Sequence, residues 1–282
     1  MRVRLREGHV VVADFPAAAL SAESIRGCGA ALRGHVDAVL AGDGGSSRVQ
    51  FPPAYRAELI QAAGLEVWTG INNRDRNRVA IEGELAALAH VGVAGIHCVT
   101  GDHTLTGSRP DAAPVFDLDS TETTALAHAA GHLVSVGESP ASPPVERRAA
   151  RLLEKQRAGA EVCYVNHAGG VEPVRTFIAE ARSIGVTLDF VACLPVVVDE
   201  ASAALLASFT TLVLPPGFLV SIARTDDPRA AGIAAAIRLG CDLLELDDVG
   251  GVNLSGGAAP GNEVAYAEAQ AEIADALTPH LR

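Results

Sequence analysis

The chain has 282 residues, of which 49% are hydrophobic, and its formal net charge at pH 7 is −12. This length allows one large core, and the acidic balance argues against a nucleic-acid partner, because phosphate contacts need clustered Lys and Arg. No run of 18 apolar residues occurs and the N-terminus lacks the apolar region of a signal peptide, so we expect no membrane span and a cytoplasmic protein.

Short β-branched segments alternate with amphipathic segments rich in Ala, Leu, Arg and Glu along the whole chain. The predicted strands cover residues 9–15, 36–41, 66–71, 95–100, 132–137, 161–166, 187–194 and 251–255. The predicted helices cover residues 19–33, 53–63, 76–90, 120–130, 144–158, 171–184, 199–209, 227–239 and 262–278. Strands that are apolar nearly throughout are typical of a parallel sheet buried on both faces.

Eight strands, each followed by a helix, predict an α/β fold of one domain, a (β/α)8 TIM barrel over residues 1–282. An open, doubly wound sheet is the alternative. That fold would place a Gly-rich turn after the first strand, whereas this chain has Pro16 followed by three alanines there. We therefore favour the barrel.

Polar side chains gather where the predicted strands end, which is where a barrel of this kind builds its site. They are Asp14, Asp43, Asp75, Asp102, His103, Glu138, Asn166 and His167. Carboxylates and an amide at one mouth suit a heterocycle with several N–H groups, such as a pterin, and proton transfer to a ring nitrogen. Polar loops without a function explain any single carboxylate equally well. Asp102 stands out, because Gly101 lets the backbone approach a ligand closely.

Metal and hydrolase sites find little support in the sequence. The nine histidines show no HxH or HExxH spacing, and although His103 and His167 could converge with Asp102, no further close ligand is evident, so we expect no metal. No GxSxG turn occurs, which argues against a serine hydrolase. The five cysteines are widely spaced and are expected to be buried in a reducing compartment.

Three short motifs follow one another in a fixed order: RDRNR at Arg74–Arg78, TGD at Thr100–Asp102 and VFDLDS at Val115–Ser120. Together they resemble the methylenetetrahydrofolate reductase family, in which runs like TCRDRN and TGD follow the third and fourth barrel strands and VFDxDS comes next. The resemblance covers most of the chain and is densest over residues 36–120. It implies a reduced folate as the partner and a barrel as the fold.

The resemblance also implies roles for single residues. Asp102 corresponds to an aspartate that approaches both flavin and folate, and we expect it to be the most important polar residue of the site. Asn166 stands where the family has a glutamine that meets the pterin, and Lys155 matches a lysine near the flavin phosphates. The remaining implied positions are Asn72, Asp75 and Leu194 on the substrate side, and Gly42, Thr100 and Gly101 on the cofactor side.

The family's catalytic acid is a glutamate at the end of the first strand, and this chain departs from that pattern. The corresponding residue is Ala13, with Asp14 next to it. Adjacent residues of a strand face opposite sides, so we expect Asp14 to serve only if the strand bulges. Glu138, at the end of the fifth predicted strand, is the preferred replacement.

Most side chains that hold a flavin in this family are also missing. Gly42, Gly70, Asn72 and Thr100 stand in their places, and the glycines are expected to widen the mouth. We therefore expect no tightly bound FAD and take NADH or NADPH as the hydride donor. The favoured activity is reduction of 5,10-methylenetetrahydrofolate to 5-methyltetrahydrofolate. A folate-dependent one-carbon transferase and a non-catalytic folate-binding protein remain alternatives, and the sequence does not predict an oligomeric state.

Overall fold

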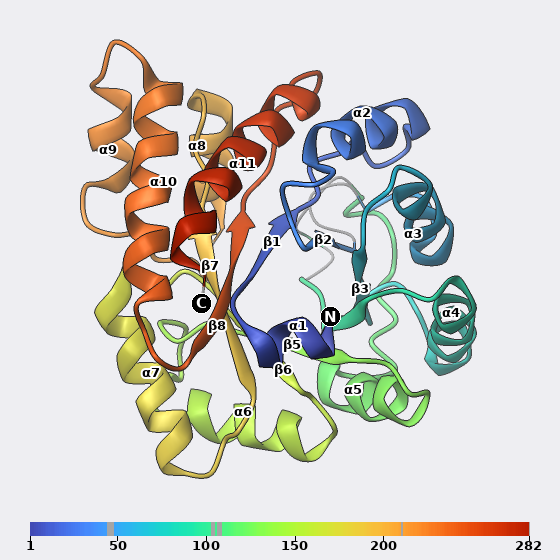
Figure 1. The fold of residues 1–282 in the computed structure, drawn as a ribbon. Helices are drawn as coiled ribbons and strands as arrows, with labels where there is room; N and C mark the ends of the chain where they lie inside the picture. Colours follow the sequence, from blue (N-terminus) through green and yellow to red (C-terminus); the bar gives the residue numbers. More distant parts are fainter. Residues whose placement is uncertain (44–47, 103–104, 106–108, 210, 282) are drawn as a thin grey trace.

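The computed structural model describes residues 1–43, 48–102, 105, 109–209 and 211–281. Eight parallel strands close into one barrel in chain order, and the last strand pairs with the first (Figure 1). The strands are β1 (Val10–Asp14), β2 (Ala38–Ala41), β3 (Val67–Asn72), β4 (Gly95–Val99), β5 (Val134–Glu138), β6 (Val162–Val165), β7 (Asp189–Pro195) and β8 (Val249–Ser255). Every predicted strand is present with small shifts at its ends, so the predicted TIM barrel is confirmed.

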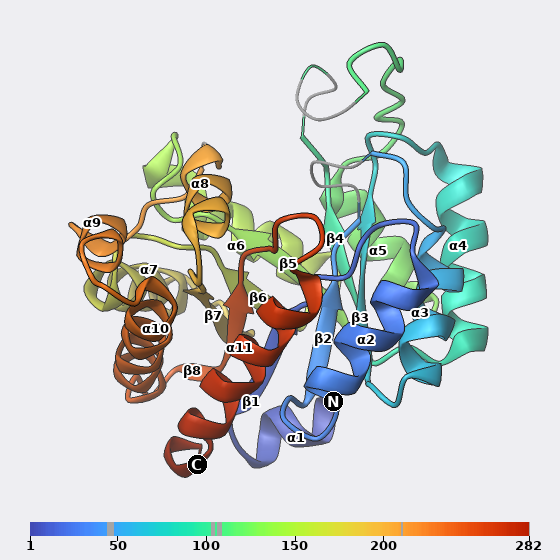
Figure 2. The same ribbon diagram turned by 90° about the horizontal axis from the view of Figure 1, so that it is seen from above.

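Helices cover the outside of the barrel (Figure 2). They are α2 (Ala22–Leu32), α3 (Pro53–Ala62), α4 (Arg78–Val91), α5 (Ser120–Ala129), α6 (Arg148–Arg157), α7 (Val171–Ser183), α8 (Glu200–Ser208), α10 (Pro228–Leu244) and α11 (Glu263–Leu277). These confirm the predicted helices, although the segment before α6 begins as a 3-10 turn at Val145–Arg147. None of the helices in the described segments combines the length and the apolar character that crossing a membrane would require.

Alternation along each strand separates two apolar cores. Val11 and Ala13 belong to the large core between barrel and helices, whereas Val10 and Val12 pack inside the barrel with Trp68. Because successive strand residues point to opposite faces, this assignment fixes the direction of every other side chain on β1. The same alternation on the other strands decides which polar residues reach the barrel mouth.

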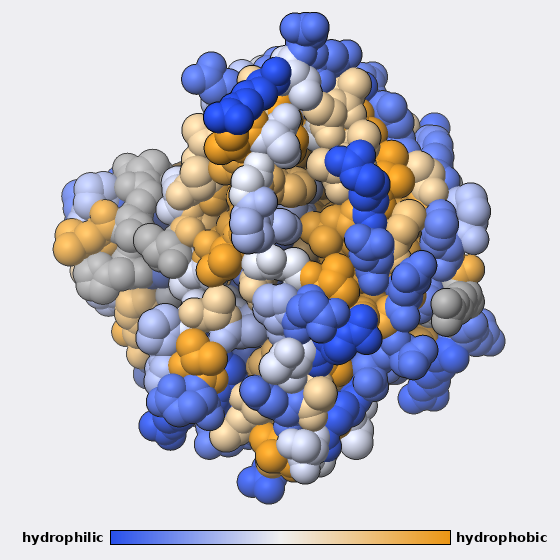
Figure 3. Space-filling model, turned by 90° about the vertical axis from the view of Figure 1, so that its left-hand side faces the viewer, coloured by the Kyte–Doolittle hydropathy of each residue, from blue (hydrophilic) through white to orange (hydrophobic). Residues whose placement is uncertain are grey.

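Two short helices were not predicted. α1 (Arg2–Glu7) lies at the N-terminal end of β1 (Figure 2). Its Leu5 packs with the barrel-interior residues. α9 (Phe218–Ala223) lies between α8 and α10, where Phe218 and Ile222 form a small separate core. Both helices have six residues, so neither shows the periodic apolar stripe that identifies a longer helix. On the face shown in Figure 3, hydrophobic residues are interspersed with hydrophilic ones.

Candidate functional site

Asp14 points into the barrel mouth. β1 keeps an unbroken parallel register with β2 and with β8, so no bulge interrupts the alternation. Val10 and Val12 face the interior, and Asp14 therefore faces the same side, while Ala13 lies in the core beneath the helices. The expectation that Asp14 needs a bulge to serve the site is wrong, because the inward position of this strand is the one that Asp14 already occupies.

Backbone and side-chain donors from the end of β8 hold the Asp14 carboxyl group. Asn253 Nδ2 donates to Oδ1 at 2.9 Å, and the Gly256 backbone N–H donates to Oδ2 at 3.1 Å. Burial raises the pKa of Asp14, and the hydrogen bonds from Asn253, Gly256 and Ser255 act in the opposite direction without cancelling that rise. A carboxyl group of this kind stays protonated closer to neutral pH than an exposed aspartate does.

A chain of polar contacts runs along the inner wall from the loop after β5 to β1. Asn166 Nδ2 donates to Ser139 Oγ at 2.9 Å, and Cys193 Sγ lies 3.7 Å from Asn166 Oδ1. Asn253 Nδ2 lies 3.9 Å from Cys193 Sγ and also donates to Asp14. The structure therefore brings Asp14 and Asn166, two predicted site residues, onto one wall and adds Asn253 and Cys193, which the sequence analysis did not single out.

An aromatic layer lies below this wall. The Tyr164 ring is 5.1 Å from the His97 ring and 5.4 Å from the Trp68 ring, measured between centroids. His97 Nδ1 lies 2.9 Å from Ser135 Oγ. Burial, with a smaller effect from the charge of Lys155, lowers the pKa of His97 to about 4, so this imidazole is neutral at physiological pH. Ile96 and Cys98 belong to the core outside β4, and Val162 lies inside β6, so strand alternation was the signal that could have placed His97 and Tyr164 inside the barrel.

Several buried polar atoms of the interior have no hydrogen-bond partner within the described part of the chain. They are Trp68 Nε1, Tyr164 OH, Asn72 Oδ1 and Asn253 Oδ1. Buried polar groups in folded proteins are nearly always satisfied by protein, ordered water or ligand. The interior therefore offers places for water molecules beneath the mouth, and it is more polar than a barrel filled with aliphatic side chains.

The β2–β3 side of the mouth is narrowed by backbone. Asp43 accepts hydrogen bonds from the Asn72 N–H at 2.8 Å and from Arg76 Nη1 at 2.6 Å, while Asn72 Nδ2 donates to the Asp43 carbonyl at 2.8 Å. A Cβ atom at Gly70 would lie 2.9 Å from the Asp43 nitrogen. The expectation that Gly70 widens the mouth is therefore wrong, because the Gly42–Asp43 backbone fills that space. Gly42 itself is exposed and borders open space.

Asp75 lies in the loop after β3, and its carboxylate forms ion pairs with two arginines. Arg74 Nη2 donates to it at 2.7 Å and Arg48 donates to its other oxygen. Burial alone would raise the pKa of Asp75, but the hydrogen bonds from Arg74 and Arg48 lower it overall. The run around Arg74 thus ties the loops after β2 and β3 together. Asp75 stays a predicted substrate contact, although these arginines already occupy its carboxylate.

Glu138 and Lys155 lie behind β5 rather than in the mouth. Glu138 shares the outward face of Val134 and Val136, and its carboxylate binds Lys155 Nζ at 2.8 Å and Arg148 Nη1 at 3.0 Å. Lys155 also donates to the Gly137 carbonyl at 2.8 Å. This placement contradicts the choice of Glu138 as the acid of the mouth. It also contradicts the expectation that Lys155 is available to phosphates, because the chain's single lysine is buried in an ion pair.

Leu194 also faces away from the mouth. Its side chain belongs to the core between barrel and helices, where it packs against Gly240 of α10. Val191 and Cys193 of β7 pack inside the barrel, and Pro195 shares their direction. Leu194 therefore supports the strand from behind, which contradicts its predicted contact with the substrate.

Thr100, Gly101 and Asp102 follow β4 at the edge of the mouth. Thr100 Oγ1 accepts from the Ser120 N–H at 3.1 Å, so this threonine helps to begin α5. Gly101 lies against Asn72, and Asp102 is exposed. His103, the next residue, lies outside the described residues. The role of Asp102 stays a prediction.

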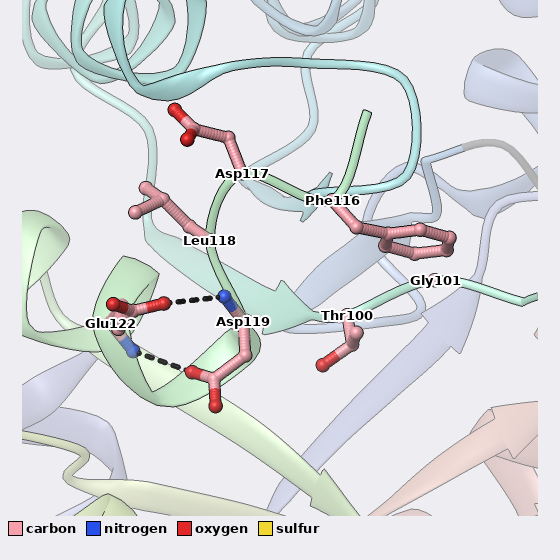
Figure 4. Close-up of a pocket in the computed structure, with 7 residues that line it drawn as sticks. All are labelled: Thr100, Gly101, Phe116, Asp117, Leu118, Asp119 and Glu122. Carbon is pink, nitrogen blue, oxygen red and sulfur yellow. Dashed lines mark hydrogen bonds between the residues drawn. The ribbon is translucent and has the colours of Figure 1, made fainter. Parts of the chain in front are cut away.

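A hollow of about 500 Å³ borders this segment (Figure 4). Thr100, Gly101, Phe116 and Asp119 are among the residues that line it. Figure 4 shows the Asp119 and Glu122 side chains bonded to one another's backbone, as in a capping box at the start of α5. Asp14 and Asn166 are not among the residues that line this hollow.

The residues present do not form a flavin cradle of the kind that the resemblance implies. Lys155 is buried in its ion pair with Glu138, and backbone occupies the space beside Gly70. Across residues 1–43, 48–102, 105, 109–209 and 211–281, no three His, Cys, Asp or Glu side chains converge in a way that could hold a metal ion.

No protein-family model matches this chain, and no curated protein matches its sequence. Among solved structures, an uncharacterized protein from Clostridium thermocellum that binds two copies of 5-methyl-5,6,7,8-tetrahydrofolic acid has a TM-score of 0.70, with 9% identity over 96% of this chain and 97% of that one. Phosphonopyruvate hydrolase in complex with oxalate and Mg²⁺ has a TM-score of 0.53, with 13% identity over 90% of this chain and 78% of its own.

A third similar structure is 2,3-dimethylmalate lyase of the PEP mutase/isocitrate lyase superfamily, with a TM-score of 0.50 and 16% identity over 94% of this chain and 91% of that one. At these identities the likenesses show a shared barrel fold. They do not by themselves assign a substrate to this chain.

Proposed function

We propose that this protein binds a reduced folate at the barrel mouth and reduces 5,10-methylenetetrahydrofolate to 5-methyltetrahydrofolate, with NADH or NADPH as the hydride donor. The observation that carries the proposal is the inner wall on which Asp14, Asn253 and Asn166 meet. The similar barrel from Clostridium thermocellum, which binds a methylated tetrahydrofolate, supports the choice of ligand.

The wall supplies the hydrogen-bonding groups that a pterin edge requires. Asn166 is partly exposed at the end of β6, and an amide offers both a donor and an acceptor. The Asp14 carboxyl group lies further round the same wall, reached through Cys193 and Asn253. A planar ring with N–H groups and ring nitrogens can add hydrogen bonds to those that both residues already make within the protein, whereas a simple apolar ligand cannot.

Asp14 is the proton donor in this proposal. Opening the five-membered ring of the substrate leaves an iminium ion at one nitrogen, and the departing nitrogen takes the proton from Asp14. A hydride from the nicotinamide then adds to the methylene carbon, which becomes the methyl group, while the nicotinamide is oxidised. A carboxyl group whose pKa is raised by burial suits this step, because a general acid works best with a pKa near the working pH.

A folate-binding protein without redox activity is the second candidate, together with a one-carbon transferase. The observation that favours a binder is the similar barrel from Clostridium thermocellum, which binds two copies of 5-methyl-5,6,7,8-tetrahydrofolic acid. The lyase and hydrolase neighbours suggest a different chemistry for the same barrel. The absence of a converging set of metal-ligand side chains in the described segments gives a Mg²⁺-dependent reaction no support.

Calorimetric titration with 5-methyltetrahydrofolate tests the binding step. Asn166→Ala should weaken binding by on the order of 1–3 kcal/mol, which is the cost of one lost buried hydrogen bond. Thr123→Val is the matched control. Thr123 lies on α5, away from the wall, and the substitution removes the buried hydrogen bond from Thr123 Oγ1 to Asn73 Oδ1. Equal affinity of Asn166→Ala and wild type would refute the assigned contact, and no binding by the wild type would refute the proposal.

Oxidation of NADH and NADPH, followed with and without 5,10-methylenetetrahydrofolate, tests the reaction. Folate-dependent oxidation with formation of 5-methyltetrahydrofolate supports the reductase. Tight folate binding without any oxidation contradicts the reductase and favours the binder or the transferase.

A further inference from the structure

Asn253 occupies a central place on the inner wall. Its side chain is 1% exposed, and in the sheet it pairs with Val12 of β1 on one side and Cys193 of β7 on the other. Its Nδ2 group donates to Asp14 Oδ1 at 2.9 Å and lies 3.9 Å from Cys193 Sγ. One buried amide thus joins the end of β1 to β7 inside the barrel.

The second oxygen of Asp14 is held by the same segment. The Gly256 N–H donates to Oδ2 at 3.1 Å. Gly256 has a φ of +146°, and a Cβ atom there would lie 2.4 Å from the Tyr266 hydroxyl oxygen, so this backbone path needs glycine. Gln270 Nε2 donates to the Asp14 carbonyl at 2.9 Å and fixes the backbone as well. Both carboxyl oxygens and the backbone of Asp14 are therefore held in one arrangement.

The titratable groups that face Asp14 are uncharged near neutral pH. They are Cys193 of β7, Tyr164 of β6 and Tyr266 of α11. Burial raises the pKa of each of them, so all three remain protonated. Burial raises the pKa of Asp14, and the hydrogen bonds to its carboxyl group lower it. Among these hydrogen bonds, the one from Asn253 has the largest effect.

We propose that Asn253 is the positioning residue of the mouth, which holds the Asp14 carboxyl group in one orientation toward a bound ligand. The part of this inference that concerns turnover rests on the proposed function, whereas the part that concerns Asp14 itself does not. Asn253 acts through Asp14 and does not need to touch the substrate. Its hydrogen bond stabilises the charged form of Asp14, so its loss makes that carboxyl group hold its proton to higher pH.

Titration of the Asp14 carboxyl carbon by ¹³C NMR tests this inference without any ligand. The Asp14 signal is assigned by its disappearance in Asp14→Asn. Asn253→Leu keeps the volume of the side chain and removes the donor, and the Asp14 midpoint is expected to rise by about one pH unit or more. Thr123→Val removes a buried hydrogen bond elsewhere and should leave the midpoint unchanged. In Asn253→Ser the side chain is too short for its hydroxyl group to reach Asp14, so this variant should also raise the Asp14 midpoint.

The kinetic arm measures the pH profile of folate-dependent turnover. In Asn253→Leu the alkaline limb should move to higher pH together with the NMR midpoint, and kcat should fall roughly tenfold while KM for the folate changes little. An unchanged Asp14 midpoint in Asn253→Leu overturns the inference, and Asn253→Ser decides in the same way if the leucine variant does not fold. A raised midpoint in a protein that shows no folate turnover supports the role of Asn253 while contradicting the proposed reaction.

Discussion

Asp14 illustrates how the direction of a single strand residue decides the composition of the mouth. In the resemblance to the reductase family, Ala13 corresponds to the family's catalytic glutamate. Because adjacent residues of a strand face opposite sides, we expected Asp14 to point away from the site. The register of β1 with β8 places Asp14 inward, where Asn253 and Gly256 hold it. The sequence predicted correctly that the end of the first strand contributes to the mouth. It could not show whether Ala13 or Asp14 faces inward, because that depends on which face of β1 meets Trp68 and on the pairing of β1 with β8, both of which are tertiary properties.

Replacement of Asp14 should separate catalysis from folding. In the wild type the folded state holds the Asp14 proton more tightly than the unfolded state does, because its pKa is raised. The contribution of this group to stability is therefore fully present below the unfolded pKa of ~4 and is lost as pH rises through the folded pKa. Asp14→Asn cannot ionise, so its thermal midpoint relative to wild type should increase as pH rises.

The same variant should lose folate-dependent turnover by roughly 10²–10⁴-fold, as expected when a general acid is removed. Thermal melts across the pH range and initial rates at one pH give the two readouts. Full turnover in Asp14→Asn, or a thermal midpoint of this variant that falls relative to wild type as pH rises, would contradict the assigned role and environment.

At the scale of elements, β5 and α6 show why a polar residue at a strand end is not always a site residue. Glu138 ends β5 as predicted, yet it faces α6, where Lys155 and Arg148 meet its carboxylate. Its side chain is fully buried, with 2% of the residue exposed. The partners come from positions 10 and 17 residues further along the chain, so their convergence required the docking of α6 on β5.

This ion cluster is expected to serve stability. Glu138→Gln leaves the Lys155 ammonium buried with its carboxylate partner removed, and breaking a buried pair from one side costs about 3–5 kcal/mol. The double variant Glu138→Gln, Lys155→Met removes both charges and should recover a large part of that loss. Denaturant unfolding of both single variants and the double variant measures the coupling between the two residues. Additive effects, or Glu138→Gln with wild-type stability and no turnover, would instead point to the catalytic role first expected for Glu138.

At the scale of the whole molecule, the barrel was predictable because each buried strand is a short apolar run bounded by turns and followed by an amphipathic helix. α1 and α9 were not predicted because six residues make fewer than two turns of helix, which is too short for a periodic apolar stripe to show. In α1 only Leu5 is buried. The residues that line the mouth were harder to predict from the sequence. Asn253 and Cys193 lie within apolar runs that read as core, and only closure of β8 onto β1 brings them beside Asp14.

Closure of the barrel also leads to a prediction about cofactor content. The loop after β2 packs its backbone against Gly70, and the single lysine is buried behind β5 in its ion pair with Glu138. Backbone therefore fills one of the places that the resemblance assigns to a flavin, and the lysine of the other faces away from the mouth. We expect the purified protein to carry little or no flavin after desalting, and added FAD to leave folate-dependent oxidation of the nicotinamide unchanged. The visible absorption spectrum of the desalted protein gives the first readout and rates with and without FAD give the second. Lys155→Met provides a matched test, since it should lower stability without changing flavin content. A stoichiometric yellow chromophore that survives desalting, or turnover that depends on added FAD, would show that a flavin binds elsewhere in the barrel and would reverse the assignment of the hydride donor.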